Sequence, residues 1–293
     1  MPVKQRREKT EFVGSYHSYY TFILQPTMED VLQTGFSLDF KVSHSRSFRQ
    51  VGRWAPGDGS AGHIPCFSPD SQLPTPYFCK MIKVHSFTFN PFSENRYILS
   101  DETGECVIID PGCHNSTEEQ ELTAFITEKG LNPVKLLNTH CHVDHVFGNL
   151  FVAEKWKLGL EMHELDVPVL ESFAKVCQMY GFSGGPQPAP AHFLKEGDTI
   201  TFGKSTLKVL FTPGHSPGSV CFYSADDKFV IGGDVLFQNS IGRTDLPGGD
   251  YATLEKSIRT QLYTLPEDVT VYPGHGPATV IGYEKRNNSF VTA

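Results

Sequence analysis

Short apolar runs that end at glycine or proline recur along the chain from residue 81 onward. An alternating run at 81–89 is followed by runs at 96–100 and 106–109. Four later runs occupy 134–138, 207–211, 229–233 and 269–274. Runs of this length, rich in β-branched and aromatic residues and bounded by turn residues, predict buried strands.

Three segments carry the periodicity of amphipathic helices instead. The first begins at Ser116 with the sequence Ser-Thr-Glu-Glu, which we interpret as a capping box. The second is expected to run from Asp166 to Tyr180, with Pro168 in its first turn. Asp166 is thereby assigned to the N-cap of this helix rather than to a metal. A third helix follows Asp250, and all three are expected outside the sheets.

Residues 1–80 differ in composition from the rest of the chain. A Ser/Arg stretch at 43–53 and a Gly/Pro/Ser-rich run at 56–76 show little periodicity, which predicts a poorly ordered N-terminal extension. Because strand-like alternation begins at Met81, residues 81–293 are expected to form the catalytic domain. We hypothesise that Met81 is the real or an alternative start, and that residues 1–80 are either disordered or not translated, in which second case they would not be part of the native protein.

Charge and cysteine content narrow the classes of function. Residues 1–80 hold nine Lys/Arg and seven Asp/Glu, residues 81–293 hold 16 and 26, and the net charge is −8. An acidic catalytic region without a basic stripe argues against nucleic acid as a partner. The seven cysteines are scattered without a C-x-x-C pair. With no signal sequence and no run of about 18 apolar residues, this pattern predicts a cytoplasmic protein without a membrane span.

Candidate chemistry is concentrated at 139–145, Thr-His-Cys-His-Val-Asp-His, which follows a predicted strand and holds three of the twelve histidines. Imidazole and carboxylate ligands suit divalent zinc, iron or manganese, and a pocket without thiolates leaves a position open for water. If the strand ends just before this segment, His140 and His142 point to one side, whereas Asp144 and His145 lie past a bend. One short segment could therefore serve two metals.

Three further candidate ligands, His215, Asp234 and His275, each follow one of the later apolar runs. Each stands in a Gly or Pro turn, where a buried strand delivers a side chain to the edge of a sheet. The four strands that precede these candidates and the 139–145 segment are therefore expected to converge on one rim.

The series His-x-His-x-Asp-His, followed by a single His, a single Asp and a last His, resembles the metallo-β-lactamase superfamily over roughly residues 81–290. The resemblance implies an α+β fold, the αββα sandwich of that superfamily, with metals at one end of the two sheets. It also implies a first metal held by His140, His142 and His215, a second held by Asp144, His145 and His275, and a bridging Asp234.

Within the superfamily, the chain is similar to the short bacterial glyoxalase II-like hydrolases. An Asp rather than a thiolate stands at position 234, and the segments Gly-Arg-Thr-Asp at 242–245 and Tyr-Pro-Gly-His-Gly-Pro at 272–277 look like that branch. The chain departs from full-length glyoxalase II because it stops 18 residues after His275, where that enzyme has a helical domain that contacts glutathione. The resemblance therefore implies the chemistry more firmly than the substrate.

The implied activity is a metal-dependent hydrolysis of thioesters such as hydroxyacylglutathione. Two divalent ions, zinc in the first place and iron or manganese as alternatives, would lower the pKa of a bridging water to about neutral and supply hydroxide as the nucleophile. Asp144 would orient this hydroxide. Two divalent ions with two carboxylates and one hydroxide keep a net positive charge, which favours a small anionic substrate. A persulfide dioxygenase with one iron is the second interpretation. The others are a lactonase, a phosphodiesterase or a non-catalytic binding protein.

Several residues near these motifs are candidates for supporting roles. Asp110 and Thr139 could contact ligand histidines and fix a tautomer, and for Asp110 an Asx turn is an equal alternative. Arg243 and Asp245 are expected to form a buried ion pair that braces a loop, with substrate contact as the alternative. Cys141 is assigned to the core. The histidines expected at the surface or at helix ends are His114, His163 and His192.

Overall fold

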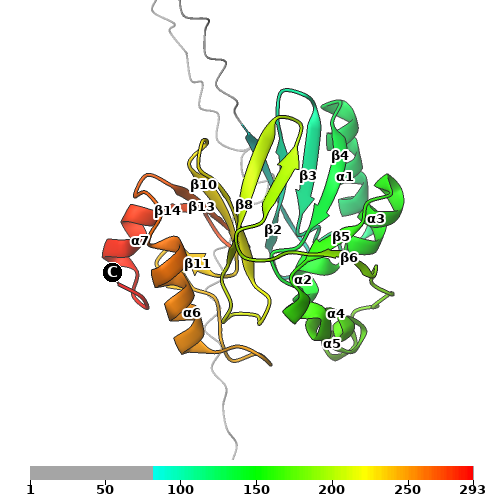
Figure 1. Cartoon of the computed structure of the whole chain (residues 1–293). Helices are drawn as coiled ribbons and strands as arrows, with labels where there is room; N and C mark the ends of the chain where they lie inside the picture. Colours follow the sequence, from blue (N-terminus) through cyan, green and yellow to red (C-terminus); the bar gives the residue numbers. More distant parts are fainter. Residues whose placement is uncertain (1–81, 293) are drawn as a thin grey trace, which may run out of the picture. The chain divides into compact units, whose positions relative to one another are not determined.

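The computed structural model describes residues 82–292, which contain two six-stranded sheets (Figure 1). The first sheet has the order β1-β2-β3-β4-β5-β6, formed by Lys83–Phe89, Glu94–Ser100, Glu105–Ile109, Asn132–Leu137, Leu160–Met162 and Pro190–Phe193. The second has the order β14-β13-β10-β9-β8-β7; in chain order β7, β8, β9, β10, β13 and β14 are Thr199–Phe202, Ser205–Phe211, Val220–Ser224, Phe229–Gly233, Thr270–Pro273 and Thr279–Val280. A separate two-stranded ribbon pairs β11 and β12, Leu236–Phe237 and Ser240–Ile241.

Helices cover the outer faces of both sheets. Figure 1 shows α1 and α3 beside the first sheet and α6 and α7 beside the second. The α-helices α1 to α7 are Ser116–Glu128, Val143–Val146, Asn149–Trp156, Val167–Glu171, Phe173–Tyr180, Tyr251–Ser257 and Ile281–Asn287. Two shorter helical turns, η1 and η2, are Glu164–Asp166 and Ile258–Leu262. Among the described residues, none of these helices has the length and apolar character needed to cross a membrane.

Three apolar layers hold these elements together. Between the sheets, side chains such as Leu99, Leu137 and Phe222 are fully buried. Outside the first sheet, Leu122 of α1 packs with strand residues, and outside the second, Leu254 of α6 does the same. Burial of such side chains is worth roughly 1.5–3 kcal/mol each before entropy is subtracted. This helix–sheet–sheet–helix stacking is the predicted αββα sandwich, which is thereby confirmed.

The strands that precede the candidate site residues end at one rim. In the first sheet β3, β4 and β5 are parallel, so their carboxyl ends lie together. In the second sheet β8 and β10 both pair antiparallel with β9, and β13 is parallel to β10, so these three also end together. Backbone hydrogen bonds join the two sheets at this rim, from Val220 N to Thr139 O and from Asn95 N to Gly274 O. The predicted convergence of four strands is confirmed.

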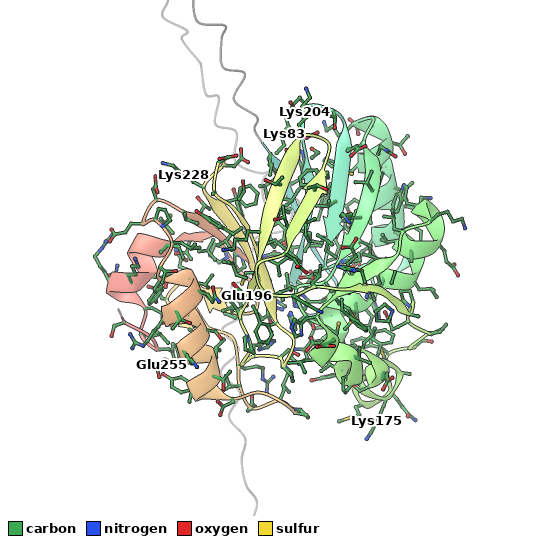
Figure 2. All side chains as sticks on the ribbon, in the orientation of Figure 1. Lys83, Lys175, Glu196, Lys204, Lys228 and Glu255 are labelled. Carbon is green, nitrogen blue, oxygen red and sulfur yellow. The ribbon has the colours of Figure 1, made fainter. Side chains whose placement is uncertain are left out.

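Turns from both sheets also meet at the opposite end of the sandwich. Asp101, in the β2–β3 turn, accepts hydrogen bonds from Lys204 N at 2.6 Å and Ser205 Oγ at 3.1 Å in the β7–β8 turn. Figure 2 shows Lys83, Lys204 and Lys228 at this end and Lys175 at the other. The charged surface lysines of this end are thus remote from the rim that holds the candidate ligands.

The predicted capping box of the first helix is wrong by one residue. Asn115, not Ser116, is the N-cap of α1, and its side chain accepts hydrogen bonds from Thr117 N and Glu118 N. Glu118 reaches back to His114 N at 2.6 Å rather than to the capping residue. The amide oxygen of Asn115 serves as acceptor as well as a Ser hydroxyl would, so pattern alone could not choose between neighbours.

The predicted continuous helix from 166 to 180 is also wrong. The segment forms η1, α4 and α5, with a break at Ser172, and Pro168 lies in the first turn of α4 as expected. Asp166 makes no side-chain hydrogen bond as a cap of α4. The third helix is as predicted, because Asp250 caps α6 through Thr253 N.

The predictions for residues 1–80, and for Met81 as a start, lie outside the described residues. The division of the chain at this point therefore stays a prediction.

Candidate metal centre

The segment after β4 forms a loop and one helical turn rather than a strand. Residues 138–142 are irregular, and Asp144 and His145 lie on α2. His140 and His145 are almost completely buried, with 1% and 0% exposure. The His140 and His145 rings lie close together, with 4.0 Å between their centres. One short segment therefore contributes His140 and His142 to one group of donors and Asp144 and His145 to another, which share a neighbourhood.

Three imidazoles converge at the first position. His142 Nδ1 lies 2.8 Å from His215 Nε2, and His215 Nε2 lies 3.2 Å from His140 Nε2. Nitrogen ligands of a tetrahedral ion with bonds of about 2.0–2.1 Å stand about 3.3 Å apart. The spacing of these three nitrogens fits a small divalent ion between them.

A second group of donors lies beside the first. Asp144 Oδ2 is 3.1 Å from His275 Nε2 and 3.8 Å from His145 Nε2. Asp234 lies between the groups, because its Oδ2 is 3.5 Å from both His215 Nε2 and His275 Nε2, and its Oδ1 is 3.5 Å from His145 Nε2. The seven predicted candidates are thus brought together in two sets that share Asp234.

Two buried atoms in this cluster have no hydrogen-bond partner among the described residues, His145 Nε2 and Asp234 Oδ1. Buried polar atoms without a partner are uncommon, because each loses its interactions with water. A cation at the second position would satisfy both atoms. The donor set of imidazoles and carboxylates suits zinc, iron or manganese.

The electrostatics of the two groups differ. Burial lowers the pKa of His140 well below its usual value and that of His142 to about 3, so both rings are neutral donors at neutral pH. Burial alone would raise the pKa of Asp144, but the His145 charge and the hydrogen bond from His275 outweigh it and hold the pKa below its usual value. Burial likewise opposes the proton on His145, yet Asp144 and Asp234 raise its pKa.

Asp110 contacts a histidine of the second group. Of its two predicted roles, a contact with a candidate ligand or an Asx turn, the structure favours the first. It follows β3, and its carboxylate accepts hydrogen bonds from Thr139 N at 2.7 Å, Thr139 Oγ1 at 2.5 Å and Asn138 Nδ2 at 3.2 Å. Its Oδ2 also lies 3.1 Å from His145 Nδ1. A proton on this nitrogen leaves His145 Nε2 facing the second position. Asp110 therefore contacts a candidate ligand histidine, as the first of its two predicted roles requires.

Thr139 and a backbone carbonyl orient two imidazoles of the first group. Thr139 Oγ1 donates to Asp110 and lies 3.1 Å from His140 Nδ1. His215 Nδ1 lies 2.7 Å from the carbonyl oxygen of Arg243 and can donate to it. In both rings the other nitrogen, Nε2, then faces the first position. These contacts aim the donors before any ion binds.

The predicted ion pair between Arg243 and Asp245 is present, but it is exposed and not buried as predicted. Arg243 and Asp245 form a two-pronged ion pair, with both N–O distances at 2.7 Å. Their side chains are 58% and 67% exposed. The loop contributes to the cluster through the Arg243 carbonyl, which side-chain chemistry could not reveal.

Two further residues beside the cluster, one of which holds a ligand loop, were not found from the sequence. Asn95 Nδ2 donates to Pro273 O at 3.2 Å and to Gly276 O at 2.7 Å, which fixes the loop that carries His275. Glu94 is fully buried, 3.9 Å from His145 Nδ1, and burial raises its pKa. Both residues precede the strand predicted at 96–100, and no sequence pattern marked them, although they open the observed β2.

Asp166 has a role that its predicted position did not reveal. It is fully buried at the end of η1, and its carboxylate accepts hydrogen bonds from Cys141 N, Ser216 Oγ and Gly218 N. It occupies the N-cap position of α4, as predicted, but its side chain does not cap that helix, and no group of candidate donors within the described residues contains it. Its position after the apolar segment at 158–162 matches the setting of the other site residues, and this signal could have found it.

The remaining predictions for histidines and for Cys141 agree with the structure. His114 packs edge-on against Phe147, and no group of donors within the described residues contains the histidines at 114, 163 or 192. Cys141 is 1% exposed, and burial raises the pKa of its thiol. None of these side chains enters the cluster.

Residues 90–275 match the family described as the metallo-beta-lactamase superfamily. The chain is 40% identical over 203 residues to the probable metallo-hydrolase YqgX of Bacillus subtilis (strain 168), which covers 69% of this chain and 93% of that protein. It is 38% identical over 206 residues to the hydroxyacylglutathione hydrolase GloC of Haemophilus influenzae, covering 69% and 94%. A solved structure, TTHA1623 in a di-iron-bound form, is 39% identical with a TM-score of 0.64, covering 71% of this chain and 100% of that one.

Proposed function

The chain belongs to the metallo-beta-lactamase superfamily, and from that premise we propose that it is a metal-dependent hydrolase of thioesters such as hydroxyacylglutathione. The observation that carries the proposal is the convergence of seven His and Asp side chains on two adjoining positions. Similarity to a metallo-hydrolase supports the reaction class, and similarity to GloC over 94% of that protein supports a thioester substrate.

The proposed ligand sets follow the two groups of donors. His140, His142 and His215 would hold a first ion, Asp144, His145 and His275 a second, and Asp234 would contact both. When bound, two divalent ions would supply a water acidic enough to attack at neutral pH and a positive charge for the carbonyl oxygen. Zinc is the proposed metal, and the di-iron form of a 39% identical protein makes iron the first alternative.

Asp144 is the proposed catalytic residue. Its side chain is 13% exposed, so the carboxylate can be reached by water and by substrate. Because its pKa lies below the usual value, the carboxylate stays ionised at neutral pH and accepts a hydrogen bond from the attacking water. Asp144 would therefore orient the nucleophile rather than store its proton.

Two side chains at the open side of the cluster support a substrate with an acyl group. The His275 side chain is 27% exposed. Phe237, just after the bridging Asp234, lies with its ring perpendicular to that of His275, at 6.3 Å between ring centres. An apolar wall beside the metal ligands would exclude water from one side of a bound acyl group.

The proposal is tested by metal analysis of the purified protein together with hydrolysis of S-D-lactoylglutathione. About two metals per chain and measurable turnover are expected. Asp144→Ala should lose at least about 100-fold in turnover, because the nucleophile is no longer oriented. Asp268→Ala is the matched control, since this Asp lies in a turn at the opposite end of the second sheet and is 57% exposed. It should keep full turnover.

Other outcomes would redirect the assignment. One iron per chain, no hydrolysis, and oxygen consumption with glutathione persulfide would contradict the proposal and favour a persulfide dioxygenase. Two metals with hydrolysis of a lactone or phosphodiester alone would keep the site and change the substrate. Cytoplasmic location and the lack of a nucleic-acid partner stay predictions, which cell fractionation and a nucleic-acid binding assay would test.

A further inference from the structure

We propose that Asp166 is a positioning residue that sets the geometry of the first metal position by tying together the two loops that supply its three histidines. This inference rests on the proposed ligand set and not on the identity of the substrate. The nearest neighbours of Asp166 in the chain contribute nothing to the cluster, so its role depends on contacts across the rim.

Asp166 is placed by the order of strands in the first sheet. It follows β5 by four residues, and β5 is parallel to β4, whose end leads into the loop with His140 and His142. Parallel neighbours end at the same edge of a sheet, which brings η1 against this loop. The Asp166 side chain is completely buried there.

Among the described residues, the donors to the carboxylate of Asp166 lie in the two loops that carry the first-position histidines. Oδ2 accepts from Cys141 N at 2.7 Å, and Cys141 stands between His140 and His142. Oδ1 accepts from Ser216 Oγ at 2.6 Å and from Gly218 N at 2.6 Å, and Ser216 directly follows His215. One carboxylate thus joins a loop of the first sheet to a loop of the second.

The fit between these loops leaves little room for adjustment. A Cβ atom added at Gly218 would lie 2.7 Å from Asp166 N and 2.8 Å from Asp166 Oδ1. Glycine therefore allows the backbone of the second loop to approach the carboxylate directly. Two backbone N–H groups, at Cys141 and Gly218, are buried by this contact and depend on Asp166 for an acceptor.

The second metal position is held by different residues. Asp110 contacts His145, and Asn95 holds the loop on either side of His275. Asp166 therefore acts on one position and not on the other. Loss of its carboxylate should loosen the first position and leave the second unchanged.

Asp166→Asn is the informative variant because it keeps the size of the side chain. An amide has one oxygen and one NH2 group, so either Cys141 N–H or Gly218 N–H must face a donor instead of an acceptor. Ser216→Ala is a milder companion, because it removes one donor and leaves both backbone contacts. Leu170→Ala, in the adjoining α4, is the control for loss of stability alone, since Leu170 is 5% exposed and touches neither loop through a hydrogen bond.

The test measures Zn²⁺ binding by competition with a chromophoric chelator, together with anomalous diffraction to show which position has lost occupancy. Asp166→Asn should weaken the first position by about 10–100-fold, the range found when a partner of a metal ligand is removed. Ser216→Ala should weaken it less, and both variants should bind the second ion as the wild type does.

The proposal is overturned if Asp166→Asn binds both ions with wild-type affinity or weakens both positions equally. It is also overturned if Leu170→Ala, at the same loss of thermal stability, reproduces the selective loss. Because the readout is metal binding, a wild-type protein that binds two ions but hydrolyses no thioester would count against the proposed substrate alone.

Discussion

Asp110 shows how much of the metal centre depends on a single backbone conformation. Its φ is +49°, in the left-handed region, where Asp and Asn are among the side chains that fit most readily. This conformation turns its carboxylate towards Thr139 and His145. A glycine would adopt the same φ but would offer no acceptor for these donors. The sequence Asp-Pro-Gly is therefore suited to both the turn and the site.

The two metal positions should respond differently to acid. Burial disfavours a proton on His145 and His275, but neighbouring carboxylates outweigh it and raise both pKa values. A metal at the second position must displace these protons, so its affinity falls as the pH drops below the raised pKa values. His140 and His142 have lowered pKa values and carry no proton to displace near neutral pH.

Metal content measured after dialysis between about pH 8 and about pH 5 should therefore fall from two ions per chain to one, with the second position emptied first. Crystals soaked at both pH values, examined by anomalous diffraction, would identify the position. Simultaneous release of both ions, or earlier loss from the three-histidine position, would contradict this expectation.

Among the secondary-structure elements, α7 holds the β11–β12 ribbon that follows Asp234. Glu284 of α7 is fully buried and accepts a hydrogen bond from Asn239 N at 3.0 Å, in the β11–β12 turn. Asn288 Nδ2 donates to Ser240 O at 2.9 Å. The short segment after His275 is thus tied to the β11–β12 turn. It braces the strand end that carries Phe237.

The N-terminus of α1 offers a clean test of which residue caps the helix. Asn115→Ala should lower the free energy of unfolding by about 1 kcal/mol, because Thr117 N and Glu118 N lose their acceptor. Ser116→Ala should change it by less than about 0.5 kcal/mol, since Ser116 is exposed in the first turn. Urea unfolding of both variants measures the difference. Equal losses, or a larger loss for Ser116→Ala, would restore the sequence-based assignment.

For the whole molecule, the similarity to known proteins involves about two thirds of the chain. The two curated relatives are covered over 93% and 94% of their length, whereas only 69% of this chain takes part in either match. The family match itself spans residues 90–275. A part of this chain thus corresponds to nearly the whole of each relative.

A chain that begins at Met81 should therefore fold and bind metal by itself. Its thermal unfolding midpoint should lie within about 2 °C of that of the full chain, a difference below about 1 kcal/mol for a domain of this size. It should also hold the same number of metals. A lower midpoint or a loss of metal would show that residues 1–80 contribute to the domain. The intact mass of the native protein would separately test Met81 as the start.

The convergence of the candidate ligands could be predicted because each candidate repeats one local pattern. His215, Asp234 and His275 each follow a short apolar run that ends in a Gly or Pro turn, and the structure brings all of them to one rim. Asp166 shares this pattern, but its role could not be predicted, and no pattern marks Asn95. Their backbone partners, such as Cys141 N and Gly276 O, lie 25 to 181 residues away, and no residue type predicts a backbone contact.

The sequence by itself determined the strands that precede the candidate ligands, the candidate donors and the resemblance to the family, because apolar periodicity and ligand chemistry are local properties of the chain. It did not predict strands such as β5, β7 and β9. Only the tertiary structure decided which nitrogen of each imidazole faces a metal position and which residues hold the ligand loops. These features depend on distances between segments of two different sheets. Asp166 makes the difference plain: by pattern it resembles a helix cap, and by position it links His140 and His142 to His215.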